Sequence, residues 1–284
     1  MATRIAFLGP AGTFSDDALR AAVGGQPYDP LPQPTVYDAL QAVADGDADR
    51  ALVPFDNSIE GTVRATLDAL AFDVRGVAIV GEHDHPVHHA LIAAERIELG
   101  EVEAVLSHPQ PLAQCARFLR SELPRAIPRA AASTAEAVRE VVEAGKPWAA
   151  LGTAIAAEIY GGVVLRENVE DEPGNVTRFV WIAPEGVRPA GDGPWRTTFF
   201  FSELGADHPG ALVEALTEFS SREINLTRIE SRPLRRGLGR YLFFIDADGR
   251  VDDPPLADAL DALRGKAEEV RVLGSYPTAS TGIP

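Results

Sequence analysis

Cysteine and lysine are scarce in this sequence of 284 residues. The single cysteine, Cys115, excludes an internal disulfide framework and a zinc site built from cysteines alone. The two lysines, Lys146 and Lys266, leave few candidates for Schiff-base chemistry. No apolar run is long enough to cross a bilayer, and the first ten residues lack a signal-peptide core. We therefore expect a cytoplasmic protein without disulfides.

Positive charge is also in deficit, because 26 basic residues face 42 acidic ones and the formal net charge is −16. Such a chain repels phosphate backbones and anionic lipid, so we expect neither a nucleic-acid partner nor a membrane partner. Hydrophobic residues make up 45% of the chain, which is enough to bury sizeable cores. At roughly 150 residues per domain, the length suggests about two domains.

One local pattern recurs over the first two-thirds of the chain: a short apolar run, a loop of small residues and an amphipathic helix. The first copy comprises a strand over 4–8, a loop over 9–15 and a helix over 16–23. Later copies start with the apolar runs 50–54, 104–106 and 148–151. Strands that alternate with helices predict a parallel α/β sheet. Because residues 77–92 separate two groups of these units, we predict two small lobes.

A different pattern follows the stretch 184–194, which carries three prolines and three glycines and resembles a linker. The expected order beyond it is strand, helix, strand, strand, helix, strand, which is the βαββαβ arrangement of a ferredoxin-like domain. The predicted organisation is a first domain over 1–184, a linker over 185–196, a second domain over 197–276 and a mobile tail over 277–284.

Hydroxyl and amide residues recur where the predicted helices begin. A helix N-terminus offers free backbone N–H groups, and in open α/β sheets such loops meet at the carboxyl ends of the strands. The set predicts a cleft for a small anion, most simply a carboxylate, although each side chain alone could merely cap its helix. Its members are Thr13, Ser15, Asn57, Ser58, Ser107 and Thr153. The first loop is neither a P-loop nor Gly-x-Gly-x-x-Gly, so a nucleotide cofactor has no support.

The segment Asn175–Phe179 enters an apolar strand. Strand alternation places Asn175, Thr177 and Phe179 on one face and Arg178 on the other, unless the strand is irregular there. Arg178 has two interpretations from the residues alone: bidentate binding of a carboxylate in the cleft, or a salt bridge at the strand edge.

The tract His83–His89 holds four histidines and resembles a metal-binding sequence. Pro86 interrupts any helix that would align the imidazoles, so we expect a solvated turn leading into a strand at 90–93, and no metal site. Cys115 lies on an apolar helix face, which favours a buried structural thiol over a nucleophile.

Six motifs in order resemble the prephenate dehydratase family with a C-terminal ACT regulatory domain. The resemblance covers nearly the whole chain, with Asp56 standing where glutamate is usual. The motifs are Gly9–Ser15, Val53–Gly61, Ser107–Gln110 with Gln114 and Cys115, Asn175–Phe179, Pro209–Leu212 and Glu230–Pro233.

The resemblance implies a two-lobed, periplasmic-binding-protein-like dehydratase domain followed by the ferredoxin-like ACT domain. It implies decarboxylative dehydration of prephenate to phenylpyruvate, carbon dioxide and water, without a cofactor. By the same resemblance, Thr177 is the donor to the departing hydroxyl, and we assign the pyruvyl carboxylate to Arg178. The other implied substrate-binding residues are Thr13, Phe14, Ser15, Asn57, Ser58, Ser107, Gln114, Asn175 and Phe179.

For the ACT domain, the resemblance implies feedback by L-phenylalanine at an interface between ACT domains, and hence a homodimer or a homotetramer. The implied effector residues are Gly210, Ala211, Leu212, Asn225, Glu230, Ser231, Arg232 and Pro233. Two alternatives stay open: arogenate dehydratase, which performs the same chemistry on an amino analogue, and a non-catalytic amino-acid sensor.

Overall fold

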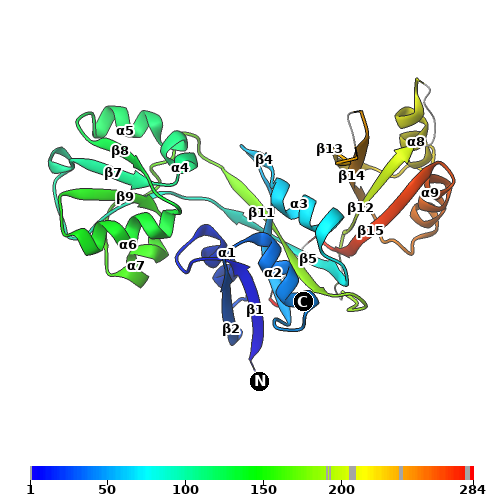
Figure 1. The fold of residues 1–284 in the computed structure, drawn as a ribbon, viewed down its shortest axis with the longest axis horizontal. Helices are drawn as coiled ribbons and strands as arrows, with labels where there is room; N and C mark the ends of the chain where they lie inside the picture. Colours follow the sequence, from blue (N-terminus) through cyan, green and yellow to red (C-terminus); the bar gives the residue numbers. More distant parts are fainter. Residues whose placement is uncertain (1, 190, 192, 205–208, 237–238, 279–281) are drawn as a thin grey trace.

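The computed structural model describes residues 2–189, 191, 193–204, 209–236, 239–278 and 282–284. Three sheets follow one another along the long axis of the molecule, with the second lobe at one end and the C-terminal domain at the other (Figure 1). The mixed α/β architecture with two lobes and a C-terminal βαββαβ domain agrees with the predicted fold class.

Lobe 1 is built on a mixed sheet of order β2-β1-β3-β11-β5, in which β1 pairs in parallel with β2 and β3. Strand β11 runs antiparallel to both β3 and β5. Its elements are β1 (Thr3–Leu8), α1 (Phe14–Ala22), β2 (Tyr28–Gln33), α2 (Val36–Ala44), β3 (Arg50–Asn57), β4 (Gly61–Thr62), α3 (Arg64–Asp68), the π-helical turn η1 (Ala69–Asp73), β5 (Val77–Pro86) and β11 (Val176–Pro184).

The sequence pattern does not predict two elements of lobe 1, β2 and α2, and one predicted helix is shorter than expected. Strand β2 contains Pro30 and Pro32, which are tolerated because β2 is an edge strand that pairs only with β1. Helix α2 follows it directly and was not predicted. After the apolar run 50–54, the strand–loop–helix pattern predicts a helix over residues 61–70. This segment opens instead with the short strand β4 and closes in a π-helical turn.

Lobe 2 carries a second sheet of order β10-β6-β9-β7-β8. The residues Ser133-Thr134-Ala135-Glu136 form a capping-box signature, which predicts the start of a helix. Helix α6 begins there, where Ser133 Oγ accepts from the backbone N–H of Glu136, and ends at Gly145 with a positive φ. The elements are β6 (Ala90–Ala93), the 3₁₀ turn η2 (Leu99–Glu101), β7 (Ala104–Ser107), α4 (Pro109–Gln114), α5 (Ala116–Glu122), β8 (Ile127–Ala130), α6 (Thr134–Ala144), β9 (Trp148–Gly152), α7 (Ala154–Tyr160) and β10 (Val163–Arg166).

Two crossing segments connect the lobes, residues 87–89 on the way out and 167–175 on the way back. Val87 N–H donates to the carbonyl of Asn175, and Val169 N–H donates to the carbonyl of His89, so the segments run side by side. The prediction of a solvated turn for the histidine tract is wrong, because His83 and His85 lie in β5. His85 and His89 are buried, at 6% and 1% exposure.

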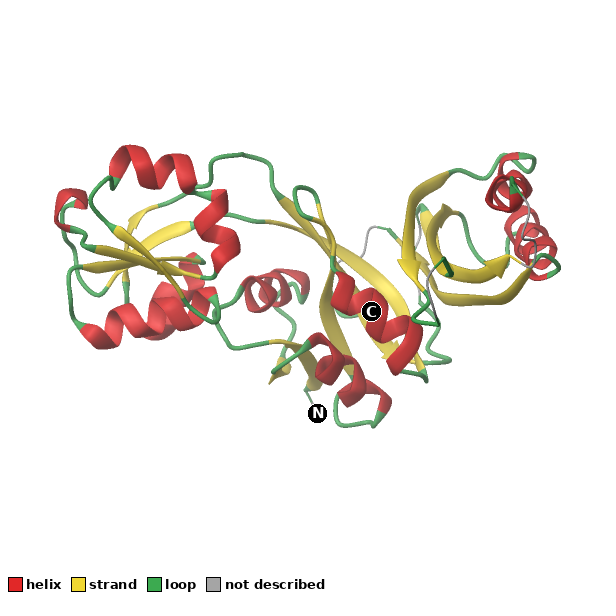
Figure 2. Ribbon diagram, turned by 45° about the horizontal axis from the view of Figure 1, so that its top comes forward, coloured by secondary structure: helices red, strands yellow, loops and turns green. Residues whose placement is uncertain are grey.

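The C-terminal domain forms an antiparallel sheet of order β13-β14-β12-β15, the ferredoxin-like arrangement. One face is covered by two helices, and the other faces lobe 1 (Figure 2). Phe200, Phe244 and Tyr276 of that second face join the hydrophobic core of lobe 1. The elements are β12 (Trp195–Leu204), α8 (Ala211–Ser220), β13 (Leu226–Pro233), β14 (Tyr241–Asp248), α9 (Pro254–Arg264) and β15 (Ala267–Pro277).

The contact between the domains is close at Gly274 on β15, where an added Cβ would lie 2.1 Å from the carbonyl oxygen of Ile79 on β5. The sequence predicts a mobile tail, but residues 282–284 make hydrogen bonds with lobe 1. Gly282 N–H donates to the carbonyl of Ala22, and Arg50 Nε donates to the carbonyl of Pro284. The chain end therefore packs on lobe 1.

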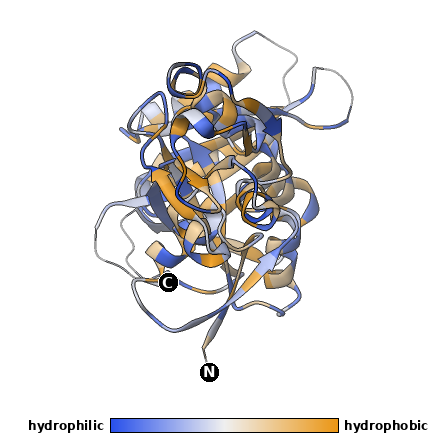
Figure 3. Cartoon of the chain, turned by 90° about the vertical axis from the view of Figure 1, so that its left-hand side faces the viewer, coloured by the Kyte–Doolittle hydropathy of each residue, from blue (hydrophilic) through white to orange (hydrophobic). Residues whose placement is uncertain are grey.

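Seen from the lobe 2 end, the helices carry both apolar and polar residues, as expected for helices that cover sheets with one face (Figure 3). Within the described residues, we find no helix whose length and apolar character would let it cross a membrane.

Candidate active site between the two lobes

A cleft of about 540 Å³ is formed by residues of both lobes and of the crossing segments. The helices α1, α4 and α6 contribute their N-terminal residues to it. The free N–H groups of α1 and α6 therefore lie near it, whereas Pro109 and Pro111 leave the start of α4 without such a set. Eight of the predicted residues line this cleft: Thr13, Phe14, Ser15, Asn57, Gln114, Asn175, Thr177 and Phe179.

Thr177 and Asn57 are joined across the neighbouring strands β11 and β3. The Nδ2 amide of Asn57 donates to Thr177 Oγ1 over 2.9 Å and to Asn175 Oδ1 over 2.7 Å. Asn57 Oδ1 accepts from the backbone N–H groups of Ile59 and Glu60. This pattern fixes the amide orientation, and because Thr177 Oγ1 accepts a hydrogen bond, its own O–H is free to donate into the cleft.

A second hydrogen-bonded chain runs across the cleft from His89 through Gln114 to Glu60. Gln114 Nε2 donates to Glu60 Oε1 over 3.0 Å, and Gln114 Oε1 lies 2.9 Å from His89 Nε2, which therefore carries the proton. Burial lowers the pKa of His89, which keeps the imidazole neutral. The ring of Phe14 meets the His89 ring edge-on at 5.1 Å.

Three predicted substrate-binding residues do not line the cleft. Ser107 is fully buried, and its Oγ donates to the carbonyl of Leu151 on β9 over 2.7 Å. Ser58 lies beside β11, where its Oγ accepts from Val176 N–H. Arg178 extends from the opposite face of β11, because successive strand residues alternate, and its guanidinium pairs with Asp246 of the C-terminal domain. The assignment of Arg178 to a substrate carboxylate is therefore corrected.

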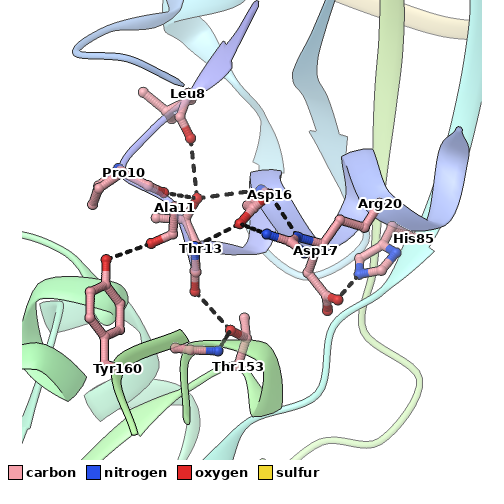
Figure 4. Close-up of polar contacts among 12 residues, drawn as sticks. Leu8, Pro10, Ala11, Thr13, Asp16, Asp17, Arg20, His85, Thr153 and Tyr160 are labelled. Atoms are coloured by element: carbon pink, nitrogen blue, oxygen red, sulfur yellow. Dashed lines mark hydrogen bonds and ion pairs between the residues drawn. The ribbon is translucent and has the colours of Figure 1, made fainter. Parts of the chain in front are cut away.

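The lobes also contact each other at the loop before α1 (Figure 4). Thr153 Oγ1 at the start of α7 donates to the carbonyl of Gly12 over 2.7 Å, and the hydroxyl of Tyr160 donates to the carbonyl of Ala11 over 2.9 Å. Thr153, which the sequence grouped with the cleft residues, thus links lobe 2 to lobe 1 instead.

Sequence reasoning missed several residues that line the cleft. His108 and Gln110 lie in a predicted motif but were not selected, and Ser133 carried a signal only as a helix cap. Glu60 lies in the motif Val53–Gly61 and His89 in the histidine tract, but the sequence did not assign either to the cleft, since their contacts are made between segments far apart in sequence. The missed side chains are Glu60, Thr62, His89, His108, Gln110, Ser133 and Thr134.

The described residues that line the cleft include no arginine or lysine. An anion bound there would rely on the helix N-termini and on neutral donors. Cys115 is buried at the junction of α4 and α5, and burial raises the pKa of its thiol to about 12, so it stays protonated. Within the described part of the chain, no cluster of three or more His, Cys, Asp or Glu residues could hold a metal ion.

The predicted effector residues divide between two faces of the C-terminal domain. Gly210 has φ +102° and precedes α8, while Asn225 Nδ2 donates to Asp248 Oδ2. Arg232 instead faces lobe 1, where its Nη2 lies 2.7 Å from Asp68 Oδ2. Its assignment to the effector site is corrected, because alternation along β13 turns this side chain toward α3.

Comparisons with known proteins agree with this architecture. The prephenate dehydratase family profile matches residues 5–187, and the ACT domain profile matches residues 203–265. A protein of Mycolicibacterium vanbaalenii named prephenate dehydratase is 42% identical over 288 residues, covering 96% of this chain and 91% of that protein.

Two solved structures are similar over nearly the full chain. One is prephenate dehydratase from Arthrobacter aurescens in complex with L-Phe, with 39% identity, a TM-score of 0.89 and coverage of 99% of this chain and 93% of the other. The second is GqqA, described as a novel type of quorum quenching acylase, with 35% identity, a TM-score of 0.86 and coverage of 97% and 98%. The sequence resemblance is confirmed: this chain belongs to the prephenate dehydratase family and carries a C-terminal ACT domain.

Proposed function

We propose that the cleft between the lobes converts prephenate to phenylpyruvate, carbon dioxide and water. In this reaction the ring carboxylate leaves as carbon dioxide, and its bonding electrons enter the ring. The ring hydroxyl departs and takes up a proton to become water. The observation that carries the proposal is the Asn57–Thr177 pair in the cleft of a chain with this family membership.

Thr177 acts on the departing hydroxyl. Because its Oγ1 accepts from Asn57 Nδ2, its O–H can donate to the leaving oxygen as negative charge develops there. A threonine hydroxyl is a weak acid, so it polarises the leaving group or relays a proton. Positioned donors of this kind typically contribute about 10²- to 10⁴-fold in rate.

The pyruvyl carboxylate is held by backbone N–H groups at the start of α1 or α6. This replaces the role first assigned to Arg178 and uses donors that lie at the cleft. Phe14 and Phe179 supply the apolar wall against which the ring packs. Because this carboxylate does not react, its binding is similar in the ground state and the transition state and mainly affects KM.

The test is formation of phenylpyruvate from prephenate by purified protein without added metal or cofactor. Thr177→Ala is expected to lower kcat by at least about 100-fold while KM changes little, and Thr177→Ser to retain much more activity. A folded Thr177→Ala protein with near-normal turnover would remove Thr177 from the mechanism.

Arogenate is the comparison substrate in the same assay, and hydrolysis of an acylated substrate tests the acylase activity named for GqqA. If arogenate is turned over faster than prephenate, the protein is an arogenate dehydratase. Acyl hydrolysis has little support at the site, because no hydrogen bond joins a histidine ring to a hydroxyl or thiol side chain among the described residues. Absence of any turnover, from folded protein, would favour the amino-acid sensor.

L-phenylalanine is the proposed effector, bound at the ACT domain in a homodimer or homotetramer. The edge strand β13 has a free side, and Ile229 and Tyr241 are exposed beside it at 49% and 46%. A second copy that covers these side chains would complete a site with Gly210–Leu212, Asn225, Glu230, Ser231 and Pro233. Mass measurement by light scattering with and without L-phenylalanine tests this, and a monomer under both conditions would contradict it.

A further inference from the structure

We propose that Asp246 of the ACT domain is a positioning residue for the dehydration, which acts on Thr177 through Arg178. The inference rests on the proposed role of Thr177. Arg178 follows Thr177 directly on β11 and projects from the opposite face, so the strand is held from the cleft side by Asn57 and from the rear by Asp246.

The rear contact is short and buried. Arg178 Nη2 lies 2.7 Å from Asp246 Oδ2, and Arg178 Nη1 lies 3.4 Å from Glu82 Oε2. Asp246 is fully buried, and its Oδ1 accepts from Thr198 Oγ1 over 2.7 Å. Thr198 Oγ1 in turn lies 2.8 Å from the hydroxyl of Tyr276, which fixes the Asp246 carboxylate within the ACT sheet.

Within this cluster Arg178 is held in its charged form. Burial disfavours the charged guanidinium of Arg178, but Asp246, Tyr276 and Glu82 together outweigh this effect and raise the pKa of Arg178. Arg196 of the ACT domain also pairs with Glu82, the other carboxylate that Arg178 meets. Removing one partner from such a cluster leaves a buried charge poorly compensated, so the position of Arg178 depends on Asp246.

An irregularity in the strand pairing connects this cluster to the cleft. Arg178 pairs with Asp56 and Phe179 pairs with Pro54, so Phe55 is an extra residue on β3. The guanidinium groups of Arg178 and Arg228 lie over the Phe55 ring, at 4.9 Å and 5.0 Å from its centre. Bulges of this kind direct side chains next to active sites, and here the bulge lies just before Asn57.

Arg228 adds a second connection from the same part of the ACT sheet. It pairs in register with Asp246, and its Nη2 donates over 2.8 Å to Oγ1 of Thr62, a residue that lines the cleft. A change in the ACT domain that displaces β13 and β14 would therefore move Arg228 and Asp246 together. The contacts behind Thr177 and beside Asn57 would change at the same time.

The test compares Asp246→Asn with Asp68→Asn in the full-length protein. Asp68 is a matched control, since it also accepts an ion pair from the ACT domain, through Arg232, but lies on α3 and not behind Thr177. Asp246→Asn is expected to lower kcat by about 10- to 100-fold with KM within about twofold of wild type, because small misplacement of a catalytic group has effects of this size. Asp68→Asn is expected to keep kcat within about twofold.

If Asp246→Asn does not fold, Thr198→Val gives the same test in milder form. It removes the donor that orients Asp246 while both charges remain, and a kcat about threefold lower with unchanged KM is expected. Asp246→Glu, which retains the charge, should recover part of the activity that Asp246→Asn loses.

Thr177→Ala measured in parallel separates the two proposals. A low kcat in Thr177→Ala with a normal kcat in folded Asp246→Asn would overturn the role of Asp246 and leave that of Thr177 in place. Equal losses of kcat in Asp246→Asn and Asp68→Asn would also overturn it, since the effect would then be general to docking of the domains.

Discussion

The side-chain amide of Asn57 donates to Oγ1 of Thr177 over 2.9 Å, and the two residues are register partners on β3 and β11. Asn57→Asp is nearly isosteric but replaces the donor by an acceptor. The carboxylate would accept the Thr177 O–H and turn it away from the cleft, so we expect kcat to fall by about 100-fold. Steady-state kinetics on prephenate provides the measurement.

Gln41→Glu on the surface helix α2 is the control for Asn57→Asp, because it makes the same change of amide to carboxylate at a half-buried position outside the cleft. Its kinetics should match wild type. If Asn57→Asp also matched wild type, the orientation of the Thr177 hydroxyl would be irrelevant to turnover.

Ser133 combines a cap of α6 with a position in the cleft. Ser133→Ala is expected to destabilise the protein by about 0.5–2 kcal/mol, as loss of a helix cap does. It is also expected to raise KM, because the start of α6, one of the two helix ends proposed for the carboxylate, loses its order. Thr35→Ala removes the equivalent cap of α2 outside the cleft. Both variants should lower Tm, and only Ser133→Ala should raise KM; an equal KM in the two would place the carboxylate elsewhere.

Gly274 permits the close approach of β15 to β5. Gly274→Ala would place a methyl group against the backbone of Ile79, which cannot give way as a flexible side chain can, so we expect destabilisation of about 3 kcal/mol or more. At Gly100, by contrast, an added Cβ would find its nearest atom 3.6 Å away, at the end of the Arg125 side chain. Thermal unfolding should separate the two variants, and similar Tm values would contradict the packing argument.

His89 gives the stability a defined pH dependence. Burial lowers its pKa in the folded state below the ordinary value of 6.5, so the unfolded chain binds more protons as the pH falls through that value. The protein should lose stability from pH 7 toward pH 5. His89→Gln cannot gain this proton, and its stability should fall less over the same range. Urea unfolding at several pH values measures both slopes; equal slopes would contradict the assignment.

Local patterns predicted much of this molecule. Period-two alternation was sufficient to place Thr177 and Phe179 on one face of β11 and Arg178 on the other. Loops rich in small polar residues before helices marked the residues of α1 and β3 that line the cleft. These features depend on a few consecutive residues. They can therefore be predicted from the sequence without information on which segments pack against them.

Contacts between distant segments were decided only in three dimensions. Ser107 ends β7 within a motif, yet the packing of β7 beside β9 buries its hydroxyl against the Leu151 carbonyl. Glu60 and His89 reach Gln114 only because the lobes face each other. Strand alternation turned Arg178 away from the cleft, but only the docked ACT sheet supplied Asp246 as its partner. The chain thus encodes its elements and the chemistry of its loops locally, whereas the partners of buried charges follow from which surfaces the hydrophobic cores bring together.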